Sequence, residues 1–496
     1  MGVIKRQSIK QSIVVYLSLA AGALNMLLLF PAALNADQIG LITVIREAAF
    51  VFVPLVFLGG GELAVRFFPI FNNEERGHQG FLFFLSCLVA VGLLLLLLLF
   101  FPFQGAILDY YGQRSSLFQD YLYYLLPLTA YLSLATMLTM YVSNFRRIAL
   151  PAVFNELLPK AGLSLLLLLL WAGLLSFNAV FQWYVWLHLL AVVGLVLYII
   201  KLGQWHIRPD FSLFDKPLVK NMTAYSIYGM VGNFGYSLAN RIDLMMLASL
   251  STLTKTGVYS IAYFIASTFE VPRKAISKVA SPLLAEYWHT GKKQEIQELY
   301  RKSALNQLIF GIGLFVSIWV SVDDLYDFMP NGDAFRSGKY VILLLSSARL
   351  FDLATGLNSE VIGYSKYYRF NLYLYAIPVL ISIVGSYMLI PRFQLEGAAM
   401  AVVLASIFYN ISKFLLIWWR LDMNPFDKQF IWPIVFGGLA CIVGLLIPST
   451  GIPILNMILK SGIAFGIFGV VVWKFNLSSD MSTIMDAAWK RIFNRK

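Results

Sequence analysis

The sequence predicts an all-α, polytopic integral membrane protein with about fourteen transmembrane helices, each near the roughly 20 apolar residues that cross a bilayer. Of its 496 residues, 59% are hydrophobic and only 13% are charged, and the mean hydropathy is +0.73. Long stretches such as Phe81–Phe101 and Leu163–Leu175 are almost free of polar side chains. These stretches are continuous, whereas a barrel strand shows about ten residues of alternating polarity. Helices are therefore expected to cross the membrane.

Short connections separate the predicted spans, and turn-forming residues such as Pro330–Asn331–Gly332 and Asn424–Pro425 mark them. None of the connections is long enough to fold into an independent domain. The predicted spans are 11–33, 39–62, 80–102, 119–143, 150–175, 179–202, 219–250, 256–284, 303–322, 336–362, 369–390, 396–419, 429–448 and 452–474.

A faint internal repeat predicts two lobes. The turn N-A-D-Q-I-G at 35–40 leads into a span that contains Pro54, and the similar turn T-L-T-K-T-G at 252–257 leads into a span that contains Pro272. Six spans return the chain to the same side, and parallel halves of this kind build an alternating-access site. The predicted division is an N-terminal lobe at 1–203, a C-terminal lobe at 204–420, two additional helices at 421–475 and a cytoplasmic amphipathic tail at 476–496.

The basic residues predict the orientation of the spans. About 25 Lys and Arg fall on one side of the membrane and about 5 on the other, which places both termini in the cytoplasm. The outer set is Arg114, Lys255, Arg336, Lys339 and Arg392. The net charge of +12 then reflects cytoplasmic loops near anionic lipid, and no nucleic-acid partner is needed. In the tail 477–496, apolar residues share one helical face and Lys490, Arg491 and Arg495 lie beside it, as in an interfacial helix.

Several classes of site are missing from the sequence. Cys87 and Cys441 lie inside apolar spans, so neither a disulfide framework nor a cysteine metal site is expected. The four His residues have no ligand spacing, and no GxxxxGK[ST] loop is present. We expect no cofactor, no metal and no catalytic residues. The run after Lys5–Lys10 is too long for a typical cleaved signal peptide, so we expect span one to be retained.

Charged residues inside a few spans are the main functional signal. A charge at the centre of a lipid-facing helix costs roughly 2.5–3.5 kcal/mol, so these residues are expected to face protein or water. The basic ones, Arg46, Arg241, Arg273, Lys274 and Arg349, are candidates for binding an anionic substrate, because Arg matches phosphate oxygens bidentately. The acidic ones are candidates for coupling to an ion: Glu47, Asp243, Glu270, Asp352 and Glu360.

The spacing of these residues predicts polar stripes on spans seven, eight and ten. In span eight, Glu270, Arg273, Lys274, Ser277 and Lys278 recur at helical spacing, next to a kink expected at Pro272. Three such stripes describe a hydrated cavity. The alternative is that the charges either neutralise one another as internal salt bridges or extend to the cytoplasmic edge. We expect this alternative, in one of its two forms, for Lys278 and Lys413. Five tyrosines in these spans either contact the faces of sugar rings or only pack against neighbouring residues: Tyr225, Tyr228, Tyr236, Tyr259 and Tyr263.

Two segments resemble a known family. The first segment is Gly59–Phe71, which reads G-G-G-E-L-A-V-R-F-F-P-I-F. The second is Arg241–Ala285, which contains R-I-D-L-M-M-L, T-G-V-Y-S-I-A, V-P-R-K-A-I and S-P-L-L-A. Both segments are similar to polysaccharide flippases of the O-antigen type. Their superfamily includes multidrug-and-toxin exporters and the lipid II flippase. The resemblance covers essentially the whole chain. It implies export of an undecaprenyl-pyrophosphate-linked oligosaccharide across the bacterial inner membrane, with the headgroup held in a cationic cavity between two lobes.

Three functions compete at this stage. The first is the lipid-linked oligosaccharide flippase for surface polysaccharide or lipopolysaccharide assembly. The second is a cation-coupled exporter of small amphipathic compounds, which would centre on the intramembrane acids. The third is a membrane polymerase or glycosyltransferase, but such enzymes usually carry a large outer loop, and the longest loops here are under about 20 residues. The basic residues favour the first. The sequence leaves three questions open: which glycan is carried, whether a proton or Na⁺ is coupled to transport, and whether polysaccharide assembly proteins are partners.

Overall fold

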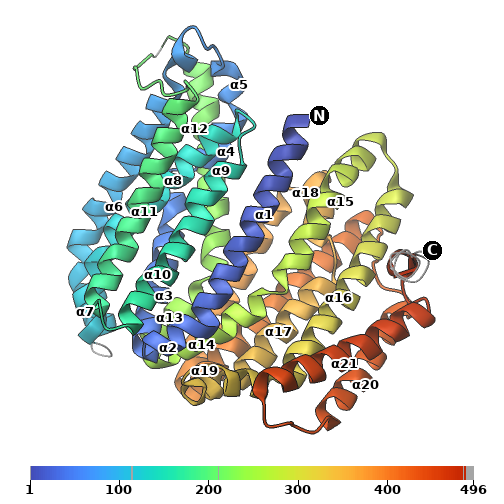
Figure 1. The fold of residues 1–496 in the computed structure, drawn as a ribbon. Helices are drawn as coiled ribbons and strands as arrows, with labels where there is room; N and C mark the ends of the chain where they lie inside the picture. The colour runs from blue at the N-terminus through green and yellow to red at the C-terminus, as the bar shows by residue number, and fades with distance from the viewer. Residues whose placement is uncertain (1, 113–115, 211, 484, 487–496) are drawn as a thin grey trace. The chain divides into compact units, whose positions relative to one another are not determined.

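The computed structural model describes residues 2–112, 116–210, 212–483 and 485–486, and the described chain is all-α, as predicted (Figure 1). Packing divides it into two compact units, which we call the N-terminal unit (Met1–Gly257) and the C-terminal unit (Val258–Lys496). The predicted division into lobes at 203/204 and at 420/421 stays a prediction. Each unit is described by itself below.

The N-terminal unit is organised around α3 and α8, which pack against each other, while α11 packs on α8 and α12 packs on α3 and α4. Helix α1 lies along α9 and α10. The helices of this unit are α1 (Gly2–Leu24), α2 (Phe30–Ala33), α3 (Ala36–Val56), α4 (Gly60–Arg66), α5 (Phe68–Phe71), α6 (Phe81–Gly112), α7 (Ser116–Tyr121), α8 (Leu125–Ser143), α9 (Ala149–Ala152), α10 (Leu158–Trp171), α11 (Phe177–Lys201), α12 (Lys216–Ala239) and α13 (Ile242–Leu250).

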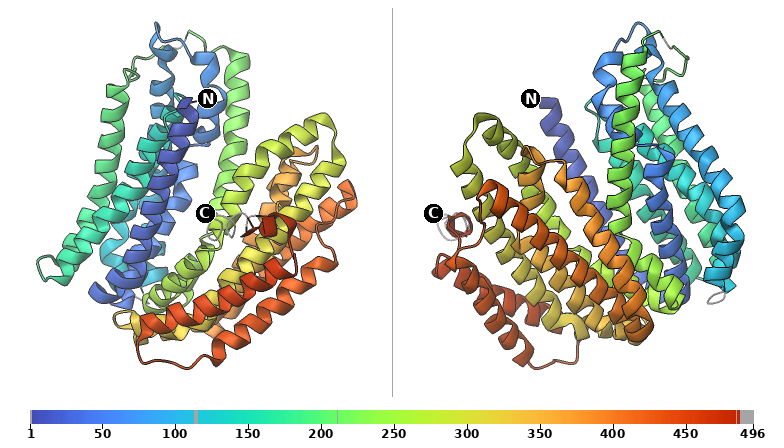
Figure 2. Two further views of the ribbon diagram at one scale, coloured as in Figure 1. Left: turned by 45° about the vertical axis from the view of Figure 1, so that its right-hand side comes forward. Right: turned by 180° about the vertical axis from the view of Figure 1, so that it is seen from behind.

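In the C-terminal unit, the long helix α16 packs against α15, α17, α20 and α21, and α19 packs against α17 and α18. Figure 2 shows α20 and α21, in orange and red, running beside α16. Helix α14 (Leu253–Ser267) begins in the N-terminal unit and continues past Val258. The other helices are α15 (Glu270–Thr290), α16 (Lys293–Phe328), α17 (Lys339–Ala354), α18 (Asn358–Tyr364), α19 (Phe370–Leu421), α20 (Ile431–Leu446) and α21 (Pro453–Lys474).

The helices account for the predicted spans. In the described ranges, 10 helices are long and apolar enough to cross a membrane, or 11 if the bent pair of α17 and α18 counts as one span. Helix α19 is two helices merged across a non-helical residue, Gln394, and so covers the predicted spans 369–390 and 396–419. Predicted spans seven and eight are helical too, but each is broken and carries the charges found there. The chain is a multi-pass membrane protein.

Three predicted spans that carry charged residues are broken. Span seven divides into α12 and α13, and Arg241 lies in the break with φ −137°. Span eight divides just before Glu270, which starts α15, so the break precedes the kink that Pro272 predicted. Pro272 instead lies in the first turn of α15, where its missing N–H is harmless. Span ten bends by 44° between α17 and α18, next to Gly356 at φ +66°.

The two turns that the sequence repeat singled out pack against each other within the N-terminal unit. A Cβ added to Gly40 would overlap the carbonyl oxygen of Leu253, and one added to Gly257 would overlap that of Ala36. The Thr254 hydroxyl also donates a hydrogen bond to Asp37. Each glycine therefore lets the opposite turn approach at backbone distance. The contact is therefore reciprocal.

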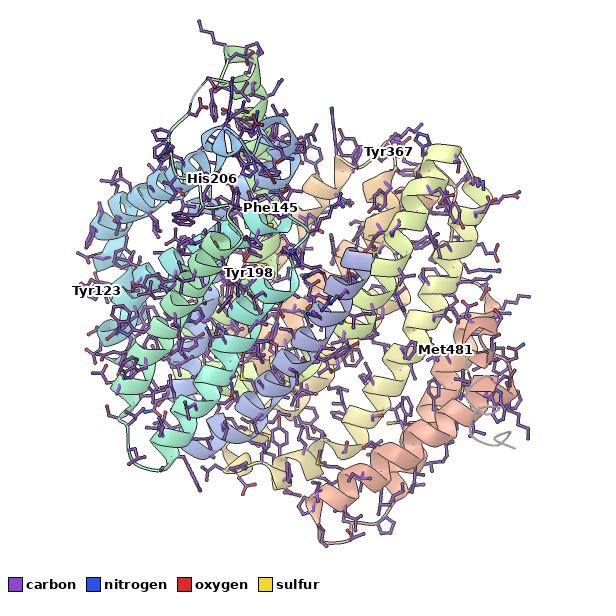
Figure 3. The ribbon with its side chains drawn as sticks, turned by 45° about the horizontal axis from the view of Figure 1, so that its top comes forward. Tyr123, Phe145, Tyr198, His206, Tyr367 and Met481 are labelled. Carbon is purple, nitrogen blue, oxygen red and sulfur yellow. The ribbon has the colours of Figure 1, made fainter. Side chains whose placement is uncertain are left out.

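Apart from the spans, two peripheral segments are well packed. His78 is buried beneath Phe145 and stacks on His206, with ring centroids 5.6 Å apart. Figure 3 labels Phe145 and His206 at this end of the N-terminal unit. In the C-terminal unit, Leu477 and Met481 pack on the α16, α20 and α21 core, so the start of the predicted amphipathic tail lies on protein. Residues 484 and 487–496 of that tail lie outside the described residues.

Candidate functional site

In the N-terminal unit, three predicted site residues form one ion-paired triad. Helix α3 carries Arg46 and Glu47, and the break between α12 and α13 places Arg241 against them. Glu47 accepts from Arg46 Nη2 at 2.7 Å through Oε1, and from Arg241 Nε at 2.8 Å through Oε2. The side chains are only 15–25% exposed. Two guanidinium groups thus share one carboxylate, and the triad carries one net positive charge.

A seam of polar contacts holds α12 against α3 and α4. The Ser226 hydroxyl donates to the Leu58 carbonyl, and the Ser237 hydroxyl donates to the Phe50 carbonyl at 3.1 Å. Arg241 Nη1 donates to the Ser237 carbonyl at 3.3 Å. Each small side chain on α12 satisfies a carbonyl that a helix end or a proline leaves unpaired. These contacts fix Arg241 beside Glu47.

The glycine-rich start of the family-like segment explains why α4 lies so close to α12. Gly59 has φ +69°, and an added Cβ would overlap the carbonyl oxygen of Ser226. Only glycine meets both demands without strain. This turn directs α4 along α12, so that Glu62 accepts from the Asn233 amide at 2.7 Å.

The C-terminal unit contains a second triad of the same kind. Glu270 at the start of α15 accepts from Lys274 Nζ at 2.7 Å, and its other oxygen lies 3.4 Å from Arg349 Nη2 on α17. Arg349 is 22% exposed, whereas the Lys274 side chain is largely exposed. Again one carboxylate lies between two basic groups, and one positive charge is in excess.

Two further polar residues of α15, Arg273 and Ser277, pair with α17 and α18. Arg273 Nη1 lies 3.1 Å from Asp352 Oδ2, and the Ser277 hydroxyl donates to Glu360 Oε1 at 2.5 Å. The predicted polar stripe of span eight therefore lies on α15 and faces the predicted stripe of span ten. The charges make the internal salt bridges that the sequence offered as the alternative to a cavity. Whether they also contact cargo stays a prediction.

Lys413 was expected either to neutralise another charge inside the protein or to extend to the cytoplasmic edge. Its side chain is 0% exposed, which excludes the second alternative. Its Nζ lies 3.1 Å from Ser359 Oγ and 3.8 Å from the centre of the Tyr409 ring. The cation–π contact and the hydroxyl stabilise an ammonium group that has left water. The sequence around Lys413 in span twelve is apolar and does not indicate where this side chain points. Only the fold shows that the Lys413 side chain points into the protein.

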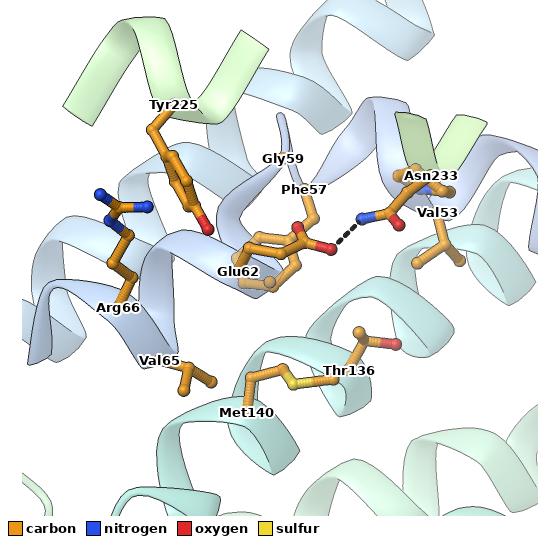
Figure 4. A pocket seen from close by; sticks show the side chains of 12 residues that line it. Val53, Phe57, Gly59, Glu62, Val65, Arg66, Thr136, Met140, Tyr225 and Asn233 are labelled. Carbon is orange, nitrogen blue, oxygen red and sulfur yellow. Dashed lines mark hydrogen bonds between the residues drawn. The ribbon is translucent and has the colours of Figure 1, made fainter. Parts of the chain in front are cut away.

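The N-terminal unit also contains a pocket of about 820 Å³. Its walls come from α3, α4, α8 and α12, and Figure 4 shows Glu62, Arg66, Tyr225 and Asn233 around it. The Arg66 guanidinium lies 4.4 Å from the centre of the Tyr225 ring. Tyr225 was a candidate for sugar contact from the sequence.

Sequence reasoning assigned no role to Glu62 or Arg66, because they lie at the predicted cytoplasmic end of span two. Their spacing of four residues, which places both side chains on one face of a helix, was the signal in the sequence that could have identified them. Of the other predicted residues, Asp243 is 3% exposed on α13, two residues after Arg241 of the first triad. In the part of the chain that the structure describes, no group of three or more His, Cys, Asp or Glu lies close enough to hold a metal ion.

Charged groups inside membrane-embedded segments often mark substrate or ion pathways. No family model matches the chain. The fold is similar to a solved structure described as the lipid II flippase MurJ in an inward closed conformation. The TM-score is 0.75, the sequence identity is 14%, and the match covers 95% of this chain and 100% of that one.

Two further proteins are similar. A multidrug resistance MATE family transporter of the MOP superfamily, in an inward-facing conformation, matches with a TM-score of 0.65, 15% identity, and 85% and 98% of the two chains. An uncharacterized membrane protein of Methanocaldococcus jannaschii is 21% identical over 301 residues, which are 57% of this chain and 58% of that protein. The chain therefore has the fold shared by the MurJ and MATE structures.

Proposed function

We propose that the protein is a flippase that moves an undecaprenyl-pyrophosphate-linked oligosaccharide across the bacterial inner membrane, for surface polysaccharide assembly of the O-antigen type, by alternating access and without catalysis. The observation that carries this proposal is the pair of triads, Arg46–Glu47–Arg241 and Lys274–Glu270–Arg349. Each has an excess positive charge within the predicted spans. Such a charge is costly in a bilayer and suits an anionic headgroup.

The fold supports the same proposal. One of the similar structures is described as a lipid II flippase, and lipid II is a lipid-linked molecule. The acidic partners also have a purpose in this scheme. A guanidinium that is already paired with Glu47 or Glu270 is held in place before cargo arrives, and it still has donors available for phosphate oxygens.

The experiment that tests the proposal is reconstitution into liposomes with a prenyl pyrophosphate that carries a sugar. Transbilayer movement is measured by enzymatic modification of the sugar from the outer side. We expect movement with the protein and none with empty liposomes. Equal movement of a prenyl lipid without pyrophosphate would contradict an anionic-headgroup site.

The second candidate is a cation-coupled exporter of small amphipathic compounds. It is favoured by the similarity to a MATE transporter and by the number of intramembrane carboxylates, which include Glu47, Asp243 and Asp352. Ethidium efflux from proteoliposomes distinguishes the two. Efflux that depends on the acids and not on the arginines would favour this candidate.

We further propose that both termini face the cytoplasm. Single cysteines near Lys292 and near Asp333, in a variant without Cys87 and Cys441, should label from the inside and from the outside respectively. Labelling of the Lys292 position from outside would reverse the proposed orientation.

A further inference from the structure

The pocket of the N-terminal unit separates two opposite charges that would normally meet. Glu62 and Arg66 are four residues apart on α4, a spacing that places side chains on one helix face and favours a Glu–Arg ion pair. They do not pair here. The Asn233 amide donates to Glu62 Oε1 at 2.7 Å, and the Tyr225 ring lies under the Arg66 guanidinium at 4.4 Å. Two residues of α12 thus hold the carboxylate and the guanidinium apart.

Both charged groups keep unused hydrogen-bonding capacity. The second carboxylate oxygen of Glu62, Oε2, is buried and has no hydrogen-bond partner. Among the described residues, no carboxylate lies within ion-pair distance of Arg66, in contrast to the arginines of the two triads. A buried acceptor without a donor is destabilising unless a ligand supplies one. The pocket therefore offers acceptors at Glu62 and donors at Arg66.

Gly229 lets α12 pack closely against the Glu62 carboxylate. A Cβ added there would lie 2.9 Å from Glu62 Oε2, closer than an ordinary contact. The volume of about 820 Å³ lies in the range of roughly 300–1,000 Å³ that small-molecule sites occupy, and it is far larger than one ion needs. Val53, Phe57 and Met140 line most of the rest. Apolar walls with a few polar groups fit a sugar ring, which has apolar faces and hydroxyl edges.

We propose that this pocket binds the sugar phosphate portion of the cargo, with Glu62 and Asn233 contacting hydroxyls of the sugar and Arg66 contacting a phosphate oxygen. Hydroxyl groups donate to a carboxylate, and the amide of Asn233 adds a donor and an acceptor. The planar guanidinium on the Tyr225 face presents its edge N–H groups to an anion. This inference rests on the proposed function, since it assigns a place in the protein to one part of the lipid-linked glycan.

The test uses the full-length protein in lipid nanodiscs and measures equilibrium binding of three kinds of probe. These are a prenyl pyrophosphate without sugar, the same lipid carrying glucose, galactose or N-acetylglucosamine, and the free 1-phosphates of these sugars. The variants are Glu62→Gln and Arg66→Gln, with Glu74→Gln, an exposed glutamate, as the matched control. Thermal melting identifies any variant that fails to fold.

We expect Glu62→Gln to weaken binding of at least one sugar-bearing lipid by roughly tenfold or more, and to leave the bare pyrophosphate lipid within about twofold of wild type. Arg66→Gln should weaken both lipids by similar factors. Gly229→Ala should behave like Glu62→Gln, whereas Gly235→Ala, whose added Cβ meets no atom within 4 Å, should be neutral. If Glu62→Gln affects both lipids equally, or neither, the pocket does not bind the sugar.

The probes separate this inference from the proposed function. If the wild type binds no prenyl pyrophosphate at all, the flippase proposal fails. Binding of the sugar 1-phosphates then tests the pocket proposal by itself. Binding of a sugar 1-phosphate that is lost in both Glu62→Gln and Arg66→Gln would support the pocket alone. If the wild type binds none of the probes, both proposals are wrong.

Discussion

Arg241 donates from Nε to the Glu47 carboxylate at 2.8 Å, although the two residues are 194 positions apart in the chain. Arg46 holds the other oxygen of the same carboxylate. The N-terminal unit therefore concentrates two basic groups and one acid at the contact of α3 with the break between α12 and α13. This arrangement determines what happens when any member is removed.

Removal of the acid should destabilise the protein. In Glu47→Gln, the Arg46 and Arg241 guanidinium groups repel each other without a counter-charge. We expect a loss of about 1–3 kcal/mol, below the roughly 3–5 kcal/mol of a fully buried pair, because the side chains keep partial contact with solvent. Thermal melting in detergent measures the loss, and Glu74→Gln is the control.

The double variant Arg46→Gln/Glu47→Gln removes the repulsion together with the acid. It should therefore recover part of the stability lost in Glu47→Gln, and a double-mutant cycle gives the coupling. Additive effects would show that the two groups do not interact in the membrane-embedded protein.

The arginines should determine cargo affinity. Arg46→Ala, Arg241→Ala or Arg349→Ala should each weaken binding of a prenyl pyrophosphate by about ten- to hundredfold, because a charge-assisted hydrogen bond contributes roughly 1.5–3 kcal/mol. Lys at these positions should rescue only partly, since it keeps the charge and loses the bidentate fork. Unchanged affinity in all three Ala variants, measured on folded protein, would rule out these residues as the phosphate site.

The acids should affect turnover more than binding. In Asp243→Ala, Glu270→Ala and Asp352→Ala, we expect headgroup binding to stay measurable while transport falls or changes its pH dependence. This follows if these carboxylates bind a coupling proton or Na⁺. The comparison is between equilibrium binding and liposome transport at several values of pH and Na⁺. Loss of cargo binding in the acid variants, with functional arginine variants, would favour the exporter of cationic compounds.

The reciprocal glycine contact should be intolerant of side chains. Gly257→Ala places a methyl group on the Ala36 carbonyl, and the backbones have to separate. Overpacking of this kind costs about 1–3 kcal/mol, and we expect a lower melting temperature and reduced transport. Gly466→Ala on α21, where an added Cβ meets no atom within 4 Å, is the control. Similar melting of the two variants would contradict the close approach.

His206 should make the stability depend on pH. Burial, together with the neighbouring His78 and Arg208, lowers the pKa of His206 below its ordinary 6.5. The fold therefore favours the neutral ring, so stability is full above about pH 6.5 and falls as the pH drops below that value. His206→Gln should show a shallower decrease in melting temperature between about pH 6.5 and pH 5 than the wild type. Identical pH profiles would refute this role.

Much of the fold follows from the sequence because bilayer crossing depends on local composition. The apolar runs predicted the spans, and helical spacing placed Glu270, Arg273 and Ser277 on one face of α15. The turns at 35–40 and 252–257 suggested an internal repeat, but only the structure shows that they contact each other. The positions of the breaks were predicted less accurately. The break in span eight comes just before Glu270, so Pro272 lies in the first turn of α15 and not at a kink inside the helix.

The partners of each charge were decided by tertiary structure alone. Hydropathy and spacing say that a charged residue cannot face lipid, but they do not say which helix lies opposite. Glu47 joins Arg241, and Glu270 joins Arg349, because helix breaks and small residues bring distant segments together. The same packing holds Glu62 and Arg66 apart and buries Lys413 over Tyr409. An ion pair depends on a few ångströms between helices that are remote in the chain, and a one-dimensional pattern does not contain that distance.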